Sequence, residues 1–295
     1  NFFLPVMNLP QAVVLTVTAE LGASMMERMP TIYAAHGGGP MPILGMDPTC
    51  RRHLESIGSM TTKPKAILVV SAHWEGSPIT VSALDKSELL FDYYGFPDES
   101  YRYEYPAPTD PALSRRVGSL LRDAGLDCVL DQDRGLDHGV FVPLMLAFPE
   151  ADVPVVAMSL HRSLDPEVHL AMGRALRPLR DDGVLILASG MSYHNMRGFR
   201  RGGGGEAAGT AFDADLGAAV LAAASAEARA ASLRAWTSLR GARDAHPREE
   251  HFLPLLVAAG AADDDDAASR IFDDVILGAK VSAFAFQPTA QAATT

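Results

Sequence analysis

Residues 66–73 read AILVVSAH, an almost unbroken apolar run that ends in a histidine. A continuous apolar run of this length is typical of a strand that is covered on both faces. Similar runs recur along the chain, and an alternating segment near its end adds one more. Together they predict strands at residues 31–35, 66–72, 79–84, 153–160, 184–188 and 279–286.

The segments between these runs have helical character. Alanine and leucine are good helix formers, and they dominate the predicted helices at residues 111–124, 166–179 and 213–236. Alternation of strands and helices predicts an α/β sandwich around a central sheet, mostly parallel or mixed. No Pro/Ser-rich linker divides the chain, so we expect one domain at 29–288, an N-terminal extension at 1–28 and a C-terminal tail at 289–295. The acidic run at 263–266 is expected in a solvated loop.

Composition excludes several classes of function. The formal net charge of -11 and the lack of a clustered Lys/Arg surface argue against nucleic-acid binding. Polar residues interrupt the apolar N-terminal segment, so no uninterrupted stretch of about 20 apolar residues is present to span a membrane. Two widely spaced cysteines, Cys50 and Cys128, indicate neither a disulfide framework nor a cysteine zinc site. A cytoplasmic protein is expected.

Histidines stand where predicted strands end. His36 follows the strand at 31–35 and precedes a Gly-Gly-Gly-Pro turn, His73 ends the strand at 66–73, and His194 follows the strand at 184–188. Ligands bind at the carboxyl ends of strands in open α/β sheets. His138 lies where a loop turns into a helix, and His251 enters an apolar helical segment. Each could be a hydrogen-bonded loop histidine, but together they favour a metal site.

Five motifs carry a more specific signal: HGGGP, SAHWE, LDHGVFVPL, ASGMSYHN and HPREEHFLPL, in this order. The set resembles that of the DOPA extradiol dioxygenase group, a branch of the class III extradiol dioxygenases in the LigB superfamily. The resemblance covers about residues 31–286. It implies an α/β sandwich, one non-haem metal and O2-dependent opening of a catechol ring to a semialdehyde.

The resemblance also implies roles for individual residues. His36, His73 and His251 match the metal-ligand motifs, and His138 and His194 match the acid/base positions. His194 can also approach the metal in this family. Fe(II) is expected for activity, and Zn(II) can occupy the same site in purified protein. A histidine whose pKa is near 6.5 can accept a catechol proton and later return one.

The carboxylate that many class III relatives supply as third ligand is replaced here by His251, although Glu249 and Glu250 stand beside it. Imidazoles also bind zinc, so a zinc-dependent hydrolase stays an alternative, as does a non-catalytic metal-binding protein. Neither the substrate among catechols nor the oligomeric state follows from the sequence. Candidates for substrate contact are the aromatic residues Trp74, Phe141 and Tyr193 and the arginines Arg197, Arg200 and Arg201.

Overall fold

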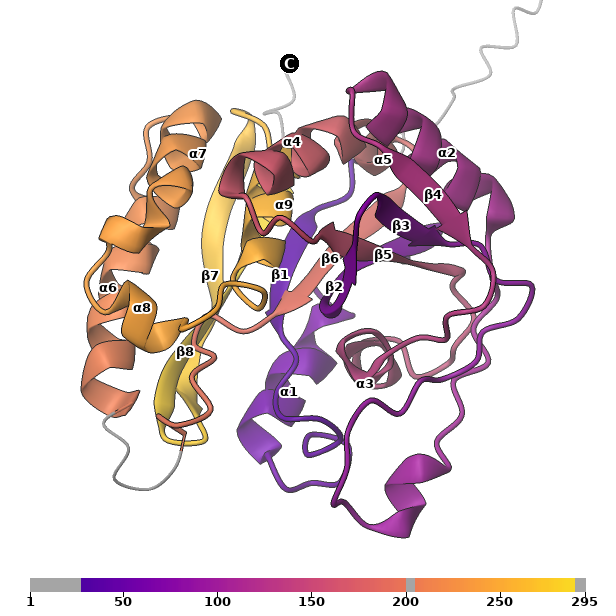
Figure 1. Ribbon diagram of the computed structural model, residues 1–295, viewed down its shortest axis with the longest axis horizontal. Coiled ribbons are helices and arrows are strands. Elements are labelled where there is room, and N and C mark those ends of the chain that lie inside the picture. Colours follow the sequence, from indigo (N-terminus) through magenta and orange to yellow (C-terminus); the bar gives the residue numbers. More distant parts are fainter. Residues whose placement is uncertain (1–27, 200–204, 290–295) are drawn as a thin grey trace, which may run out of the picture.

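An eight-stranded sheet runs through the computed structural model, which describes residues 28–199 and 205–289 (Figure 1). Its strands lie in the order β4-β3-β5-β2-β6-β1-β8-β7. The strands are β1 (Thr31–Ala35), β2 (Ala66–Gly76), β3 (Ile79–Ser82), β4 (Cys128–Asp131), β5 (Val155–His161), β6 (Val184–Gly190), β7 (Asp266–Ile276) and β8 (Ala279–Pro288). Nearly all of the expected N-terminal extension and C-terminal tail lies outside the described residues.

The sheet is mixed. At its centre β2 pairs in parallel with both β5 and β6, and β6 pairs in parallel with β1. The added strand β8 is antiparallel to β1 and to β7, and β3 is antiparallel to β5. The α/β fold expected from the sequence is confirmed. Because β1, β2 and β6 are neighbouring parallel strands, their carboxyl ends meet at one edge of the sheet.

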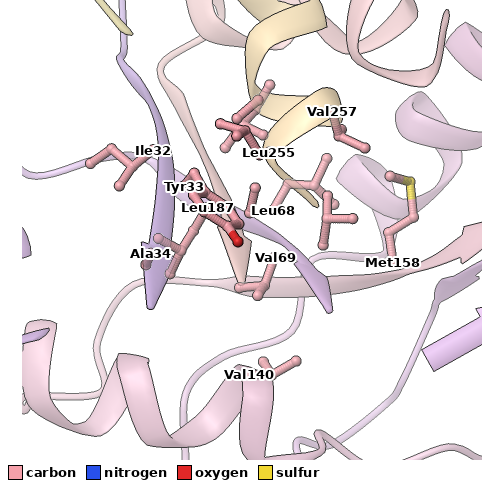
Figure 2. Close-up of a cluster of buried hydrophobic side chains, with 14 of the residues drawn as sticks. Ile32, Tyr33, Ala34, Leu68, Val69, Val140, Met158, Leu187, Leu255 and Val257 are labelled. Carbon is pink, nitrogen blue, oxygen red and sulfur yellow. The ribbon is translucent and has the colours of Figure 1, made fainter. Parts of the chain in front are cut away.

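Helices cover both faces of the sheet (Figure 1). Helix α9 (Leu253–Ala261) contacts β1, β2 and β6 on one face, and α3 (His138–Ala147) contacts β2 and β6 on the other. Figure 2 shows Leu255 and Val257 of α9 above the central strands and Val140 of α3 below them. The other helices are α1 (Pro48–Ile57), α2 (Pro111–Asp123), α4 (Pro166–Leu176), α5 (Pro178–Asp181), α6 (Gly205–Leu221), α7 (Ala226–Arg234) and α8 (Ala242–Ala245), with 3-10 turns at Asp98–Tyr101 and Trp236–Ser238.

Two expectations near the C-terminus were wrong. The helix predicted at 213–236 is broken, because Ser225 caps a separate helix α7 by accepting a hydrogen bond from the Ala228 amide. Asp266, expected in a solvated loop, begins β7 and is buried. Its carboxylate accepts hydrogen bonds from the buried Arg180 guanidinium at 2.6 and 2.7 Å, and this ion pair satisfies a charge that could not otherwise be buried.

Several predicted boundaries also moved. The helix predicted at 166–179 ends at Leu176, and Pro178 begins the short helix α5. Strand β2 continues past His73 to Gly76, so His73 does not end its strand. Its pairing with β6 stops at Ser71, however, and its register with β5 shifts between Ser71 and Glu75. Within the described ranges, no helix is both long and apolar enough to cross a membrane.

Candidate metal centre

The backbone holds His36 and His73 at the ends of the central strand pairs. The His36 amide donates to the Gly190 carbonyl at 3.1 Å, just beyond the β1–β6 pairing. The next residue, Gly37, has a φ of 78°, and a Cβ there would lie 2.9 Å from Cys50 Sγ, so glycine lets the chain turn tightly away. His73 sits in the irregular stretch of β2, where the backbone leaves the regular pairing with β5 and β6.

His251 precedes helix α9, and its backbone carbonyl is hydrogen-bonded to one residue of β1 and to the residue that follows β6. Its carbonyl accepts hydrogen bonds from the Tyr33 hydroxyl at 2.9 Å and the Met191 amide at 3.0 Å. Gly190 makes this approach possible, since a Cβ at that position would lie only 2.3 Å from the His251 carbonyl oxygen. The start of α9 is therefore fixed to the ends of β1 and β6.

The three imidazoles of His36, His73 and His251 meet at their Nε2 atoms. Nε2 of His73 lies 3.2 Å from Nε2 of His36 and 3.2 Å from Nε2 of His251. Imidazole nitrogens about 2.1 Å from one metal ion would be separated by ~3.0–3.4 Å at ligand angles of about 90–110°. The observed spacing therefore fits a single metal ion.

The hydrogen bonds of His36 decide which of its nitrogens carries the proton. Its Nδ1 lies 2.8 Å from Ser189 Oγ, and the Ser189 hydroxyl donates its own proton to the Gly139 carbonyl. Ser189 therefore accepts from His36, which places the imidazole proton on Nδ1. The inward-facing Nε2 is left with a lone pair.

The same holds for the other two imidazoles, whose outer partners are carboxylates. Nδ1 of His251 lies 3.0 Å from Glu250 Oε1, and Nδ1 of His73 lies 3.5 Å from Asp92 Oδ2. An ionised carboxylate only accepts, which places the His251 proton on Nδ1, and the nearby Asp92 carboxylate favours the same tautomer of His73. Three inward-facing nitrogens thus face one another in a buried site, an arrangement that suits a bound cation and in which each outer partner orients its imidazole.

Burial keeps these rings neutral. Desolvation, reinforced by the neighbouring imidazoles, lowers the pKa of His36 and His251 well below the usual histidine range and that of His73 to about 3. Metal ligation requires the neutral imidazole, because a protonated ring has no lone pair to give. The donor set is therefore ready for a metal at neutral pH.

His138 and His194 flank the three imidazoles, each on its own carboxylate. Nδ1 of His138 lies 2.7 Å from Asp92 Oδ1, and its backbone amide, at the start of α3, donates to the same oxygen at 3.0 Å. Nδ1 of His194 lies 3.2 Å from Glu250 Oε1, and its ring stacks on His251 with centroids 3.4 Å apart.

The two carboxylates are ionised. Burial opposes ionisation of Asp92 most strongly, but the two hydrogen bonds from His138 and the electrostatic contacts with His138 and His73 together outweigh it and lower the pKa to about 2. Burial likewise opposes ionisation of Glu250, yet the His194 contact and its neighbours lower its pKa below the usual value. Glu249 is taken up elsewhere, in an ion pair with Arg243 at 2.6 Å.

A cavity of about 410 Å³ opens over all five histidines. Beyond them and Asp92 its wall is mainly apolar, including Met41, Tyr93, Phe96, Met191, Phe199 and Leu277. Volumes of this size are typical of small-molecule sites. The arrangement can hold one metal ion next to a space large enough for an aromatic substrate, with two further imidazoles at the same wall.

Some of the site residues predicted from the sequence line the cavity and others do not. It brings His36, His73, His138, His194 and His251 to one cavity. The aromatic candidates Trp74, Phe141 and Tyr193 are instead buried in the core and do not line it.

The arginine candidates do not supply a substrate contact either. Arg197 is exposed and does not line the cavity, and Arg200 and Arg201 lie outside the described residues. Asp92 was missed by sequence analysis. Its segment has no regular structure, and a bridge between Leu89 and Leu136 brings it to His138. No local sequence signal announces that contact.

Comparison with known proteins agrees with this geometry. The model of the family "Catalytic LigB subunit of aromatic ring-opening dioxygenase" matches residues 24–283. Over 257 residues the chain is 40% identical to the dioxygenase tasH of Hapsidospora irregularis, covering 79% of this chain and 78% of that protein. Over 237 residues it is 40% identical to 4,5-DOPA dioxygenase extradiol of Beta vulgaris, covering 78% and 86% respectively.

A solved structure of an uncharacterised protein from Escherichia coli K12 has the same fold. It superposes with a TM-score of 0.71 at 29% sequence identity and covers 88% of this chain and 99% of that one. The chain therefore belongs to the family of the catalytic LigB subunit of aromatic ring-opening dioxygenases, which confirms the extradiol ring-cleaving class of oxidoreductase that its motifs predicted.

Proposed function

We propose that this protein opens catechol rings next to their hydroxyls with O2, using Fe(II) held by His36, His73 and His251. The observation that carries the proposal is the convergence of the Nε2 atoms of three imidazoles, with the opposite nitrogen of His36 and of His251 held by a hydrogen bond and that of His73 facing the Asp92 carboxylate. When bound, Fe(II) supplies a redox-active centre that can take both catechol and O2 and pass electron density from ring to oxygen.

The ligand set consists of three imidazoles in this proposal. Glu250 stands next to His251, but its Oε1 is directed at the Nδ1 atoms of His194 and His251. It therefore serves as the outer partner of the ligand His251. Zn(II) fits the same nitrogens, but zinc is not redox-active and cannot support the oxidation.

His138 is assigned the proton transfer on the Asp92 side of the cavity. Its Nδ1 proton is committed to Asp92, so Nε2 is the nitrogen available to a substrate. The ionised Asp92 fixes the ring orientation and stabilises the imidazolium that forms when Nε2 accepts a catechol proton. A positioned base of this kind lets the catechol hydroxyl ionise at neutral pH.

His194 is assigned the second proton transfer. Its Nδ1 lies against Glu250, which leaves Nε2 as the free nitrogen in the cavity wall. Ring opening needs one proton removed from a hydroxyl and one delivered as the O–O bond breaks. Two imidazoles, each with its own carboxylate, can divide these tasks. Both atoms of O2 end in the semialdehyde product, so no external reductant is required.

The test compares metals in the same protein. Metal-free protein is loaded anaerobically with Fe(II) or with Zn(II), then mixed with catechol in an oxygen electrode. Only the iron form should consume O2, one molecule per ring, and it should produce a yellow ring-opened semialdehyde. A colourless dicarboxylic acid would mean cleavage between the two hydroxyl-bearing carbons, and the absence of O2 uptake in the iron form would overturn the proposal.

A further inference from the structure

The tip of the β7–β8 hairpin carries a leucine in an unfavourable place. Strand β7 ends at Ile276 and β8 begins at Ala279, so the loop is Leu277–Gly278, with φ values of 51° and 85°. Two-residue loops with both φ values positive usually carry Asn-Gly, Asp-Gly or Gly-Gly, because a larger L side chain is strained there. Asparagine would form this turn better than Leu277 does.

Leu277 is also partly exposed to water. Leu277 is 39% accessible, yet it lines the cavity. Its Cδ1 lies over Gly38, and a Cβ added to Gly38 would lie 3.6 Å from this atom. Neither the turn nor solvent favours leucine at this position. The remaining place for a favourable contact is the cavity that it faces.

Other apolar side chains at the cavity share this exposure. Tyr94 is 91% and Met196 63% accessible, and both line the same cavity as Leu277. They come from three separate segments of the chain. Large apolar groups that gather at one opening while remaining exposed indicate a surface that is covered when a ligand binds.

The charge of the cavity completes the pattern. Among the described residues, no lysine or arginine lines it, and its wall beyond the histidines and Asp92 is mainly apolar. Among those lining residues, a substituent that carries a carboxylate would find no lysine or arginine to pair with. An uncharged apolar substituent would instead cover the exposed side chains.

We infer that the substrate is a catechol with an uncharged, apolar substituent, and that Leu277 and Met196 determine this specificity by contacting it. The inference rests on the proposed function and narrows it. It departs from dihydroxyphenylalanine, the amino-acid catechol in the names of several relatives, whose side chain carries a carboxylate and an ammonium group.

The experiment measures kcat/KM by O2 uptake in the full-length Fe(II)-loaded protein for 4-propylcatechol, catechol and dihydroxyphenylalanine. Wild type should prefer 4-propylcatechol to each of the others by about tenfold or more. Leu277→Asn should bring the ratio of 4-propylcatechol to catechol close to one, while the melting temperature rises because asparagine accepts the left-handed turn. Met196→Ser should lower the same ratio without raising the melting temperature.

Ala151→Asn is the matched control. Ala151 has a φ of 49° and does not line the cavity, so this variant should gain thermal stability and keep the wild-type ratio. An unchanged ratio in both Leu277→Asn and Met196→Ser, or a wild-type preference for dihydroxyphenylalanine, would overturn the inference while leaving catechol cleavage intact. Failure of the iron form to cleave any of the three catechols would overturn the proposed function and the inference with it.

Discussion

Two groups of histidines in this protein are equally buried and have different surroundings. His36 and His251 lie at the carboxyl edge of the central strands, where their Nε2 atoms face a third imidazole. His53 and His246 instead pack against aromatic rings. The ring centroids are 4.7 Å apart for His53 and Phe272 and 5.4 Å apart for His246 and Phe252.

Burial alone therefore does not mark a functional histidine. Burial lowers the pKa in both groups, to about 3 for His53 and for His246. The difference lies in what each ring nitrogen faces. At the cavity the outer nitrogen has a partner and the inner one points to other lone pairs. Within the described residues neither nitrogen of His53 has a hydrogen-bond partner. Nε2 of His246 donates to the Ser192 carbonyl at 2.8 Å.

The largest expected effect tests the first group. His73→Ala removes the imidazole that stands between the other two, so we expect loss of most bound metal and of all O2 uptake. Metal analysis of the purified variant and an oxygen electrode measure both. The control is His53→Leu, which removes a buried imidazole that does not line the cavity and should keep wild-type metal content. Full metal occupancy in His73→Ala would exclude His73 as a ligand.

A smaller effect is expected at the flanking histidines. His138→Ala and His194→Ala should each slow catechol turnover by about 100- to 10,000-fold while metal content stays near wild type, because general acid/base assistance is lost and the three ligands remain. Loss of metal from His194→Ala would make His194 a ligand, and undiminished rates in both would rule out the proton transfers proposed for them.

The smallest effect concerns stability in the second group. His53→Leu should increase the free energy of unfolding by about 1 kcal/mol, since it removes polar atoms without partners from an apolar site and leucine favours helix. The measurement is denaturant unfolding at neutral pH. A loss of stability would mean that the His53 ring makes a contact that leucine cannot replace.

We also expect His53→Leu to change how the free energy of unfolding depends on pH. The unfolded chain binds a proton at His53 near pH 6.5, whereas the folded protein does so only near pH 3. The unfolded state therefore binds more protons between these values, and this residue lowers stability as pH falls from about 6.5 towards 3. His53→Leu should lose less stability than wild type between pH 7 and pH 5.

Much of the fold was predictable because strands and helices follow local patterns. Strand β1 was placed at its observed residues, and the starts of β2, β3, β6 and β8 were also placed correctly. Strand β7 was missed because its polar, acidic sequence offers no apolar run. It is held instead by pairing with β8 and by the buried contact of Asp266 with Arg180, two interactions between segments far apart in sequence.

The candidate site was also predictable in part. Strand ends and motifs named five histidines, because a histidine after a buried strand must emerge at the sheet edge. Asp92 and Leu277 were not predictable, since one reaches His138 through an irregular segment and the other faces the cavity from a hairpin tip. The sequence by itself determined six of the eight sheet strands and the histidines that could carry the chemistry. Only the tertiary structure decided which imidazoles share a centre and what surrounds them, because strand order, a register shift in β2 and the packing of α9 set distances that no local pattern encodes.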